Sequence, residues 1–146
     1  MGYTIIQALD IDGPELAELR VAAMRPSLEA IGRFDPSRAR ERFLSGFCSS
    51  STWKVLLNNQ TVGFYAYEIK EDHIWLSHLY FHPESQNLGL GGRVLDYIKD
   101  IAANNQLPIR LGALKQSPSN IFYSKQGFKP THDEEWDTYY EYSNDE

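Results

Sequence analysis

The stretch Gln86-Asn87-Leu88-Gly89-Leu90-Gly91-Gly92 decides the fold because of the segments that flank it. Residues 73–81, before it, are predicted to form a strand, and the apolar residues after it recur at helical spacing: Leu90, Val94, Leu95, Ile98, Ile101 and Ala102. A glycine-rich turn between a strand and a helix directs backbone N–H groups outward at the positive end of the helix dipole. Because glycine has no Cβ, an anion can approach this backbone closely. The stretch therefore predicts a site for a phosphate or a pyrophosphate.

Two common phosphate-binding patterns do not fit this stretch. The dinucleotide fingerprint needs a third glycine at position 94, where Val94 stands, and the P-loop needs Gly-Lys-Ser/Thr where the chain has Gly91-Gly92-Arg93. The pattern that fits, Gln-x-x-Gly-x-Gly-Gly, resembles the coenzyme A pyrophosphate loop of GNAT-type N-acetyltransferases. On this loop alone, the alternative is a glycine-rich connection that holds no ligand.

A second motif follows in the order that this family has. Residues 114–128 resemble the GNAT segment Asn-Pro-Ala-x-x-Leu/Phe-Tyr-x-x-x-Gly-Phe, and the part from Tyr123 to Phe128 matches fully. The chain departs from the pattern at Ser117, where asparagine is common, and at Ser119, where alanine is usual. Ser117 can still act as a helix cap, so the departure puts in doubt only contacts that are specific to asparagine.

The N-terminal third extends the resemblance to almost the whole chain. The run from Arg20 to Phe34 and the arginine-rich segment before Phe43 resemble one bacterial branch of the family. The resemblance implies a single GNAT-type acetyltransferase domain over residues 1–146, with acetyl-coenzyme A as the cofactor.

Composition excludes several other classes of protein. The length of 146 residues suits one domain, and the net charge of −6 argues against a nucleic-acid partner, whose binders need basic patches. No apolar run approaches the ~20 residues that cross a bilayer, and the N-terminus has no signal-peptide pattern. Cys48 is the single cysteine, which excludes an intrachain disulfide and a metal site built on cysteines. We therefore expect a cytoplasmic protein with no metal and no membrane partner.

The remaining segments predict an α/β (α+β) fold. A helix should run from Asp12 or Gly13 to about Met24, where Pro26 interrupts it, followed by a loop or short helix. Other helices are expected at 36–46, 90–105 and 118–126, and strands at 3–8, 53–57, 62–69, 73–81, 109–114, 128–131 and 136–142. Close turns near 58–60 and 70–72 favour antiparallel pairing, whereas strand 109–114 follows a strand and a helix and should lie parallel to 73–81. The prediction is a mixed, mostly antiparallel sheet of about seven strands with about four helices. A fully parallel, doubly wound sheet is the alternative.

In the GNAT fold the parallel strand pair splays apart and pantetheine inserts there. The resemblance implies that Leu79 and Phe81 offer backbone groups to the pantetheine and the thioester, and that the pyrophosphate lies on the amides of residues 88–92. Arg93 either supplies positive charge there or is an ordinary exposed arginine. The full set of implied cofactor contacts is Leu79, Tyr80, Phe81, Gln86, Asn87, Leu88, Gly89, Leu90, Gly91, Gly92, Arg93, Ser117, Asn120 and Tyr123.

Tyr123 is the candidate catalytic residue, because it resembles the tyrosine that protonates the departing coenzyme A thiolate in this family. A phenol is protonated at neutral pH and can donate through a fixed hydrogen bond. The alternative is a tyrosine of the core. Asn120, one helical turn earlier, faces either the same cleft or the solvent.

The acceptor and the general base are less clearly defined by the sequence. Arg25, Glu29 and His78 are candidates for binding the substrate, and the base could be His78, Glu68, Tyr80 or Glu29. His78 is out of phase with Leu79 and Phe81, which favours a packed or partly solvated histidine on the other face of the sheet. The acceptor would be a small-molecule or peptide amine. A homodimer through the aromatic strand 136–142 is left open, and so is a non-catalytic module that binds coenzyme A or a protein.

Overall fold

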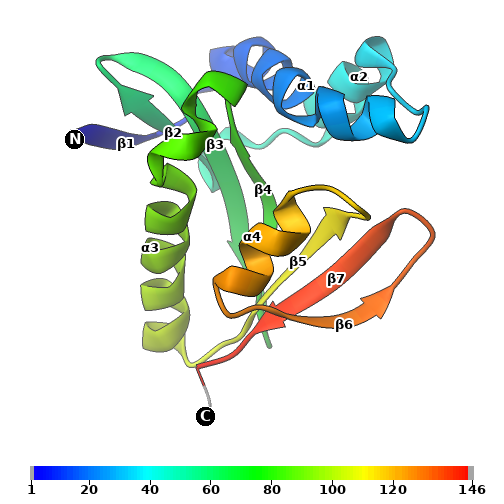
Figure 1. The fold of residues 1–146 in the computed structure, drawn as a ribbon. Helices are drawn as coiled ribbons and strands as arrows, with labels where there is room; N and C mark the ends of the chain where they lie inside the picture. The colour runs from blue at the N-terminus through cyan, green and yellow to red at the C-terminus, as the bar shows by residue number, and fades with distance from the viewer. Residues whose placement is uncertain (1, 145–146) are drawn as a thin grey trace. The chain divides into compact units, whose positions relative to one another are not determined.

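The computed structural model describes residues 2–144 (Figure 1). Over these residues the chain forms seven strands: β1 (Tyr3–Gln7), β2 (Thr52–Leu57), β3 (Gln60–Ile69), β4 (Ile74–Phe81), β5 (Ile109–Leu114), β6 (Lys129–Asp133) and β7 (Asp137–Tyr142). The α-helices are α1 (Gly13–Ala30), α2 (Pro36–Gly46), α3 (Leu90–Asn105) and α4 (Ser119–Lys125), and short 3-10 helices are η1 (Asp10–Asp12), η2 (Ser49–Ser51) and η3 (Pro83–Leu88).

The strands form one mixed sheet in the order β1-β2-β3-β4-β5-β7-β6. Strands β4 and β5 are parallel, with Ile74 opposite Ile109 and Trp75 opposite Arg110. The pairs β1–β2, β2–β3, β5–β7 and β6–β7 are antiparallel. The β2–β3 turn has positive φ at both Asn58 and Asn59, as a two-residue hairpin requires. The predicted mixed, mostly antiparallel sheet is therefore confirmed, and the doubly wound alternative is wrong.

The described residues divide into two compact units, one of residues 2–66 and 78–88 and the other of residues 67–77 and 89–144. In the first unit α1 and α2 pack against each other (Figure 1). Its core contains Ala8, Leu16, Ala17, Leu19, Phe43 and Phe64, with Phe47 and Tyr80 packed against them. Asp12, at the start of α1, forms an ion pair with Lys54 of β2 at 3.2 Å, which ties the helix to the sheet.

The predicted end of the first helix was wrong, because α1 continues through Pro26 to Ala30. Proline inside a helix removes one hydrogen bond and costs about 3 kcal/mol. The last turn is nevertheless held by the Arg25–Glu29 ion pair, which spans Pro26, and by the packing of α1 on α2. The helix ends where Gly32 takes a φ of 70° and its N–H donates to the Glu29 carbonyl at 3.1 Å.

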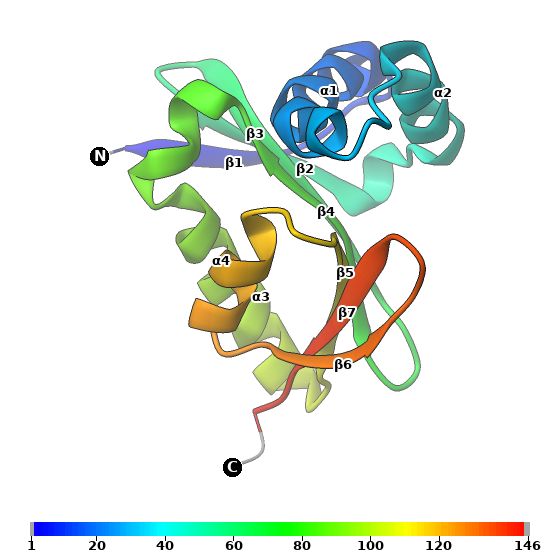
Figure 2. The ribbon, with the colours of Figure 1, turned by 45° about the vertical axis from the view of Figure 1, so that its right-hand side comes forward.

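In the second unit most of the predicted apolar stripe of α3 is buried: Leu90, Val94, Leu95, Ile98 and Ala102 are each at most 2% exposed, whereas Ile101 is only half-buried. Helix α4 packs on β5, and β7 lies between β5 and the edge strand β6 (Figure 2). In residues 2–144, no helix combines the length and the apolar character that a membrane span requires.

Candidate functional site

The turn before α3 has the geometry of an anion site. Gly89 occupies the N-cap position of α3 with a φ of 77°, which is a left-handed conformation that favours glycine. No side chain caps this end, and the N–H of Arg93 donates to the Gly89 carbonyl at 3.3 Å as the helix begins. The amides of the preceding first turn, residues 90–92, have no carbonyl four residues back within the helix. These three amides therefore have no acceptor within the helix.

Packing within the protein does not explain the glycine at position 92. A Cβ built there would meet only the side-chain nitrogen of Gln126 at 3.4 Å, which is an ordinary contact. Glycine in a helix is about 1 kcal/mol less favourable than alanine. A close approach to this backbone by a ligand would explain a residue that the helix itself disfavours.

The segment before this turn is anchored to the end of β4. Gln86, Asn87 and Leu88 are exposed in η3, and the Gln86 side-chain amide donates to the Phe81 carbonyl at 3.2 Å. Phe81 itself is buried over Gly63, where a Cβ would lie 2.3 Å from the phenylalanine ring. Gly63 was not predicted from the sequence as a contact position, although a glycine inside a strand signals such a close approach. Leu79 is half-buried on the same strand, and Arg93 is exposed on α3.

Tyr123 lies inside an aromatic cluster of the second unit. Its side chain is 7% exposed, and its ring centroid lies 5.6 Å from that of Phe128 and 6.3 Å from that of Tyr140. Ser117 is also buried, and its N–H donates to the Leu114 carbonyl at 3.2 Å. Tyr123 and Ser117 are therefore both buried, and both belong to the second motif of the family resemblance.

Asn120 is half-buried, and its side chain is bound within the protein. Its amide nitrogen donates to the carbonyls of Leu114 at 2.9 Å and Ser117 at 3.0 Å, and its oxygen accepts a hydrogen bond from the Tyr140 hydroxyl at 2.7 Å. This network holds the turn between β5 and α4, in which Gln116 has a φ of 67°. Asn120 thus fixes the segment that carries Ser117.

We expect Asn120→Ala to destabilise the protein by about 2–3 kcal/mol, because the Tyr140 hydroxyl and two carbonyls lose their partner. Tyr140→Phe should cost about 1 kcal/mol, since it removes one hydrogen bond and keeps the ring. Urea unfolding of both variants measures the difference. Equal unfolding midpoints for Asn120→Ala and the wild type would show that the network does not hold the turn.

The three proposed substrate residues lie in different environments. Arg25 and Glu29 form an exposed ion pair at 3.1 Å, and the Arg25 guanidinium lies 5.1 Å from the Phe34 ring. His78 instead packs among the rings of Phe43, Phe64 and Tyr80, at centroid distances of 5.2, 6.0 and 5.7 Å. The prediction of a packed histidine is therefore confirmed.

Burial, with a smaller contribution from the positive charge of Arg20, lowers the pKa of His78 from 6.5 to about 4. His78 is therefore neutral at pH 7 and a weak acceptor of protons, which disfavours it as the general base for an ammonium substrate. Among the other candidates, Glu68 forms an exposed ion pair with Lys70 at 3.4 Å.

We expect the stability of the protein to fall as the pH drops from about 6.5 to about 4. In this window the unfolded chain binds a proton at His78 and the folded chain does not, so each pH unit costs up to about 1.4 kcal/mol. Urea unfolding across this range should show a shallower slope for His78→Gln than for the wild type. His82→Gln, at an exposed histidine, is the control, and identical slopes in all three proteins would contradict the prediction.

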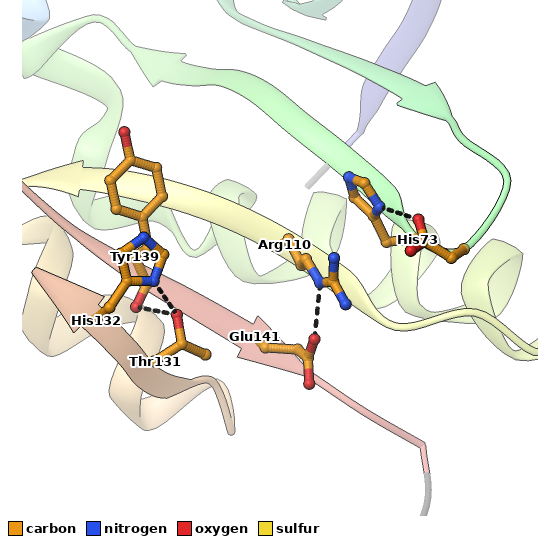
Figure 3. A network of polar contacts seen from close by, with 7 residues as sticks. His73, Arg110, Thr131, His132, Tyr139 and Glu141 are labelled. Carbon is orange, nitrogen blue, oxygen red and sulfur yellow. Dashed lines mark hydrogen bonds and ion pairs between the residues drawn. The ribbon is translucent and has the colours of Figure 1, made fainter. Parts of the chain in front are cut away.

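A polar and aromatic network on β5, β6 and β7 was not predicted from the sequence (Figure 3). The Arg110 side chain bonds Glu141 at 2.8 Å, and His132 stacks on Tyr139 with ring centroids 4.7 Å apart. The Tyr139 ring lies over Gly112, where a Cβ would be 3.0 Å from the ring. The glycine inside this strand was therefore the sequence feature that could have indicated the contact. Since β7 is paired on both edges and Tyr140 is buried, this strand belongs at least partly to the core.

Comparison with known proteins identifies the family. Residues 49–130 match the profile described as an acetyltransferase (GNAT) domain, and they run through both compact units. The chain therefore belongs to the GNAT family of acetyltransferases, whose acyl donor is acetyl-coenzyme A, so the family and cofactor predictions are confirmed. No curated protein gives a significant match.

Solved structures show the same fold over nearly the full chain. The PaiA N-acetyltransferase of Thermoplasma acidophilum, in complex with coenzyme A, has a TM-score of 0.84 at 21% identity and covers 98% of this chain and 99% of its own. A GNAT acetyltransferase of Staphylococcus aureus has a TM-score of 0.74 at 18% identity, covering 97% and 99%. The ribosomal-protein-S18-alanine N-acetyltransferase of Escherichia coli has a TM-score of 0.71 at 17% identity, covering 97% and 94%.

Proposed function

We propose that this protein is an N-acetyltransferase of one domain, residues 1–146, that transfers the acetyl group of acetyl-coenzyme A to a primary amine by direct attack. The acceptor is a small molecule or a peptide. The observation that carries the proposal is the uncapped, glycine-rich start of α3 in a chain that belongs to the GNAT family. Support comes also from the structural likeness to an N-acetyltransferase bound to coenzyme A and to another that acts on an alanine of a ribosomal protein.

In this proposal the pyrophosphate binds the amides at the start of α3. These amides supply the positive end of the helix dipole, and Arg93 adds a full positive charge from an exposed position one residue further on. The other proposed cofactor contacts follow the family motifs: the backbone of Leu79, Tyr80 and Phe81, the loop residues Gln86, Asn87 and Leu88, and Ser117 and Asn120 in the second motif.

Tyr123 has the role of general acid in this proposal. The neutral amine would first attack the acetyl carbon and lose a proton to solvent; the C–S bond would then break, and the Tyr123 phenol would donate its proton to the departing sulfur. The aromatic rings around Tyr123 restrict its rotation, which favours a fixed donor. The cytoplasmic location stays a prediction, and so does the homodimer.

The test is release of free thiol from acetyl-coenzyme A in the presence of a panel of amines, with cofactor binding measured separately by calorimetry. We expect binding without amine, and thiol release that depends on at least one amine. Binding with no release across the panel would favour the non-catalytic module, and absence of binding would overturn both functions.

A further inference from the structure

Two buried nitrogen atoms in the first unit have no hydrogen-bond partner: Nε of Arg20 in α1 and Nδ1 of His78 in β4. Arg20 donates through Nη1 to the Ala39 carbonyl at 3.3 Å, and its guanidinium carbon lies 5.7 Å from the Tyr80 ring centroid. Within residues 2–144, no carboxylate forms an ion pair with Arg20. By contrast, Arg25 and Arg40 are bound to Glu29 and Glu18. A half-buried cation without an anion is costly, so this arrangement needs an explanation.

The surroundings of the two atoms favour an anion over a cation. The guanidinium carries a permanent positive charge and presents a planar set of N–H donors. His78 is neutral at pH 7 because of its burial and the charge of Arg20, and in the Nδ1–H tautomer it adds another donor. The walls are the rings of Phe43, Phe64 and Tyr80, which would strengthen an ionic contact by excluding water. An ammonium group would meet a like charge here.

We propose that Arg20 and His78 bind a carboxylate of the acceptor, so that the substrate class of this enzyme is amino acids and other amines that carry a carboxylate. This inference rests on the proposed function, because the bound carboxylate compound is an acceptor only if the protein is an N-acetyltransferase. Guanidinium and carboxylate match in shape and charge, and the pair forms two parallel hydrogen bonds. Arg20 and His78 are each half-buried as residues while the two nitrogens are covered, so in this proposal a ligand reaches them by displacing the side chains that cover them.

The binding test does not depend on catalysis. The side-chain 15N resonances of His78 at pH 7 are followed while phenylacetate is added, with phenethylamine as the cationic match and sodium chloride as the ionic-strength control. We expect phenylacetate, and neither of the other two additives, to shift the resonances saturably. The affinity for phenylacetate should fall at least tenfold in Arg20→Met. Arg20→Lys keeps the charge and loses the planar donor set, and it should weaken binding to an intermediate degree. Absence of a shift in the wild type would overturn the proposal.

The kinetic test compares phenylalanine with phenethylamine and lysine with cadaverine, which differ only in the carboxylate. We expect kcat/KM to favour the amino acid at least tenfold, mainly through KM, and we expect Arg20→Met to bring this ratio close to one. Arg42→Met, at an exposed arginine of α2, should leave the ratio unchanged. A ratio near one in the wild type would overturn the carboxylate preference. If phenylacetate binds at His78 but the protein releases no thiol, the proposed function is overturned and the carboxylate site is retained.

Discussion

Gly92→Glu is expected to weaken coenzyme A binding at least about 100-fold, which is about 2.8 kcal/mol, without unfolding the protein. Position 92 is the third residue of α3, where a glutamate side chain reaches back toward the N-cap amide. The new carboxylate would therefore occupy the amides that the pyrophosphate needs and would repel its charge. Glutamate also interacts favourably with the helix dipole, and a Cβ at this position meets only Gln126 at 3.4 Å.

The control for charge is Gly92→Gln, which adds the same bulk without the negative charge. We expect calorimetry to show that the wild type binds coenzyme A most tightly, Gly92→Gln less tightly and Gly92→Glu least tightly. Both variants should have thermal midpoints at or above that of the wild type, because glutamine and glutamate favour a helix more than glycine does. Gly89→Asp is a poorer test, since the φ of 77° at Gly89 adds backbone strain. A Gly92→Glu protein that binds coenzyme A normally would place the anion site elsewhere.

Local patterns in the sequence predicted the parts of the fold that depend on nearby residues. The apolar stripe of α3 and the turn before it depend on residues within about one helical length of each other. The spacing of these residues was therefore enough to predict both features. The β2–β3 hairpin was equally local, because Asn58 and Asn59 both tolerate positive φ. The parallel pairing of β4 and β5 followed from the strand-helix-strand order alone.

The end of α1 shows where a local rule fails. Pro26 breaks the hydrogen-bond pattern of an isolated helix, and nothing near it in the sequence shows that the packing of α1 on α2 offsets the cost. Gly32 was visible as a termination signal, but Pro26 is the stronger signal in a sequence and comes first in the chain. Tertiary contact therefore decided the helix length.

The environment of the candidate site could not be read from the sequence for a similar reason. The burial of His78 depends on Phe43 and Phe64, and its pKa depends also on Arg20, all from segments far away in the chain. The bond from Tyr140 to Asn120 likewise joins residues 20 positions apart. Motifs identified which residues to consider, whereas three-dimensional contacts determine their charge state and their freedom to move.

Tyr123→Phe is expected to keep coenzyme A affinity within about twofold and to lower kcat about 100-fold. The phenylalanine ring retains the contacts with Phe128 and Tyr140, so the substitution removes the hydroxyl and leaves the packing. Loss of a general acid costs about 100-fold to 10,000-fold. We expect the low end of this range, because a coenzyme A thiolate is a fair leaving group without protonation.

The pH profile distinguishes acid catalysis from a structural effect. A phenol that has lost its proton cannot donate one, so the wild type should lose its advantage over Tyr123→Phe at alkaline pH and the ratio of the two kcat values should shrink there. A purely structural loss would give a constant ratio. Tyr97→Phe, at an exposed tyrosine of α3, is the matched control and should keep wild-type kcat. If Tyr123→Phe turns over within twofold of the wild type on a confirmed acceptor with chemistry rate-limiting, Tyr123 is a packing residue, and water protonates the thiolate.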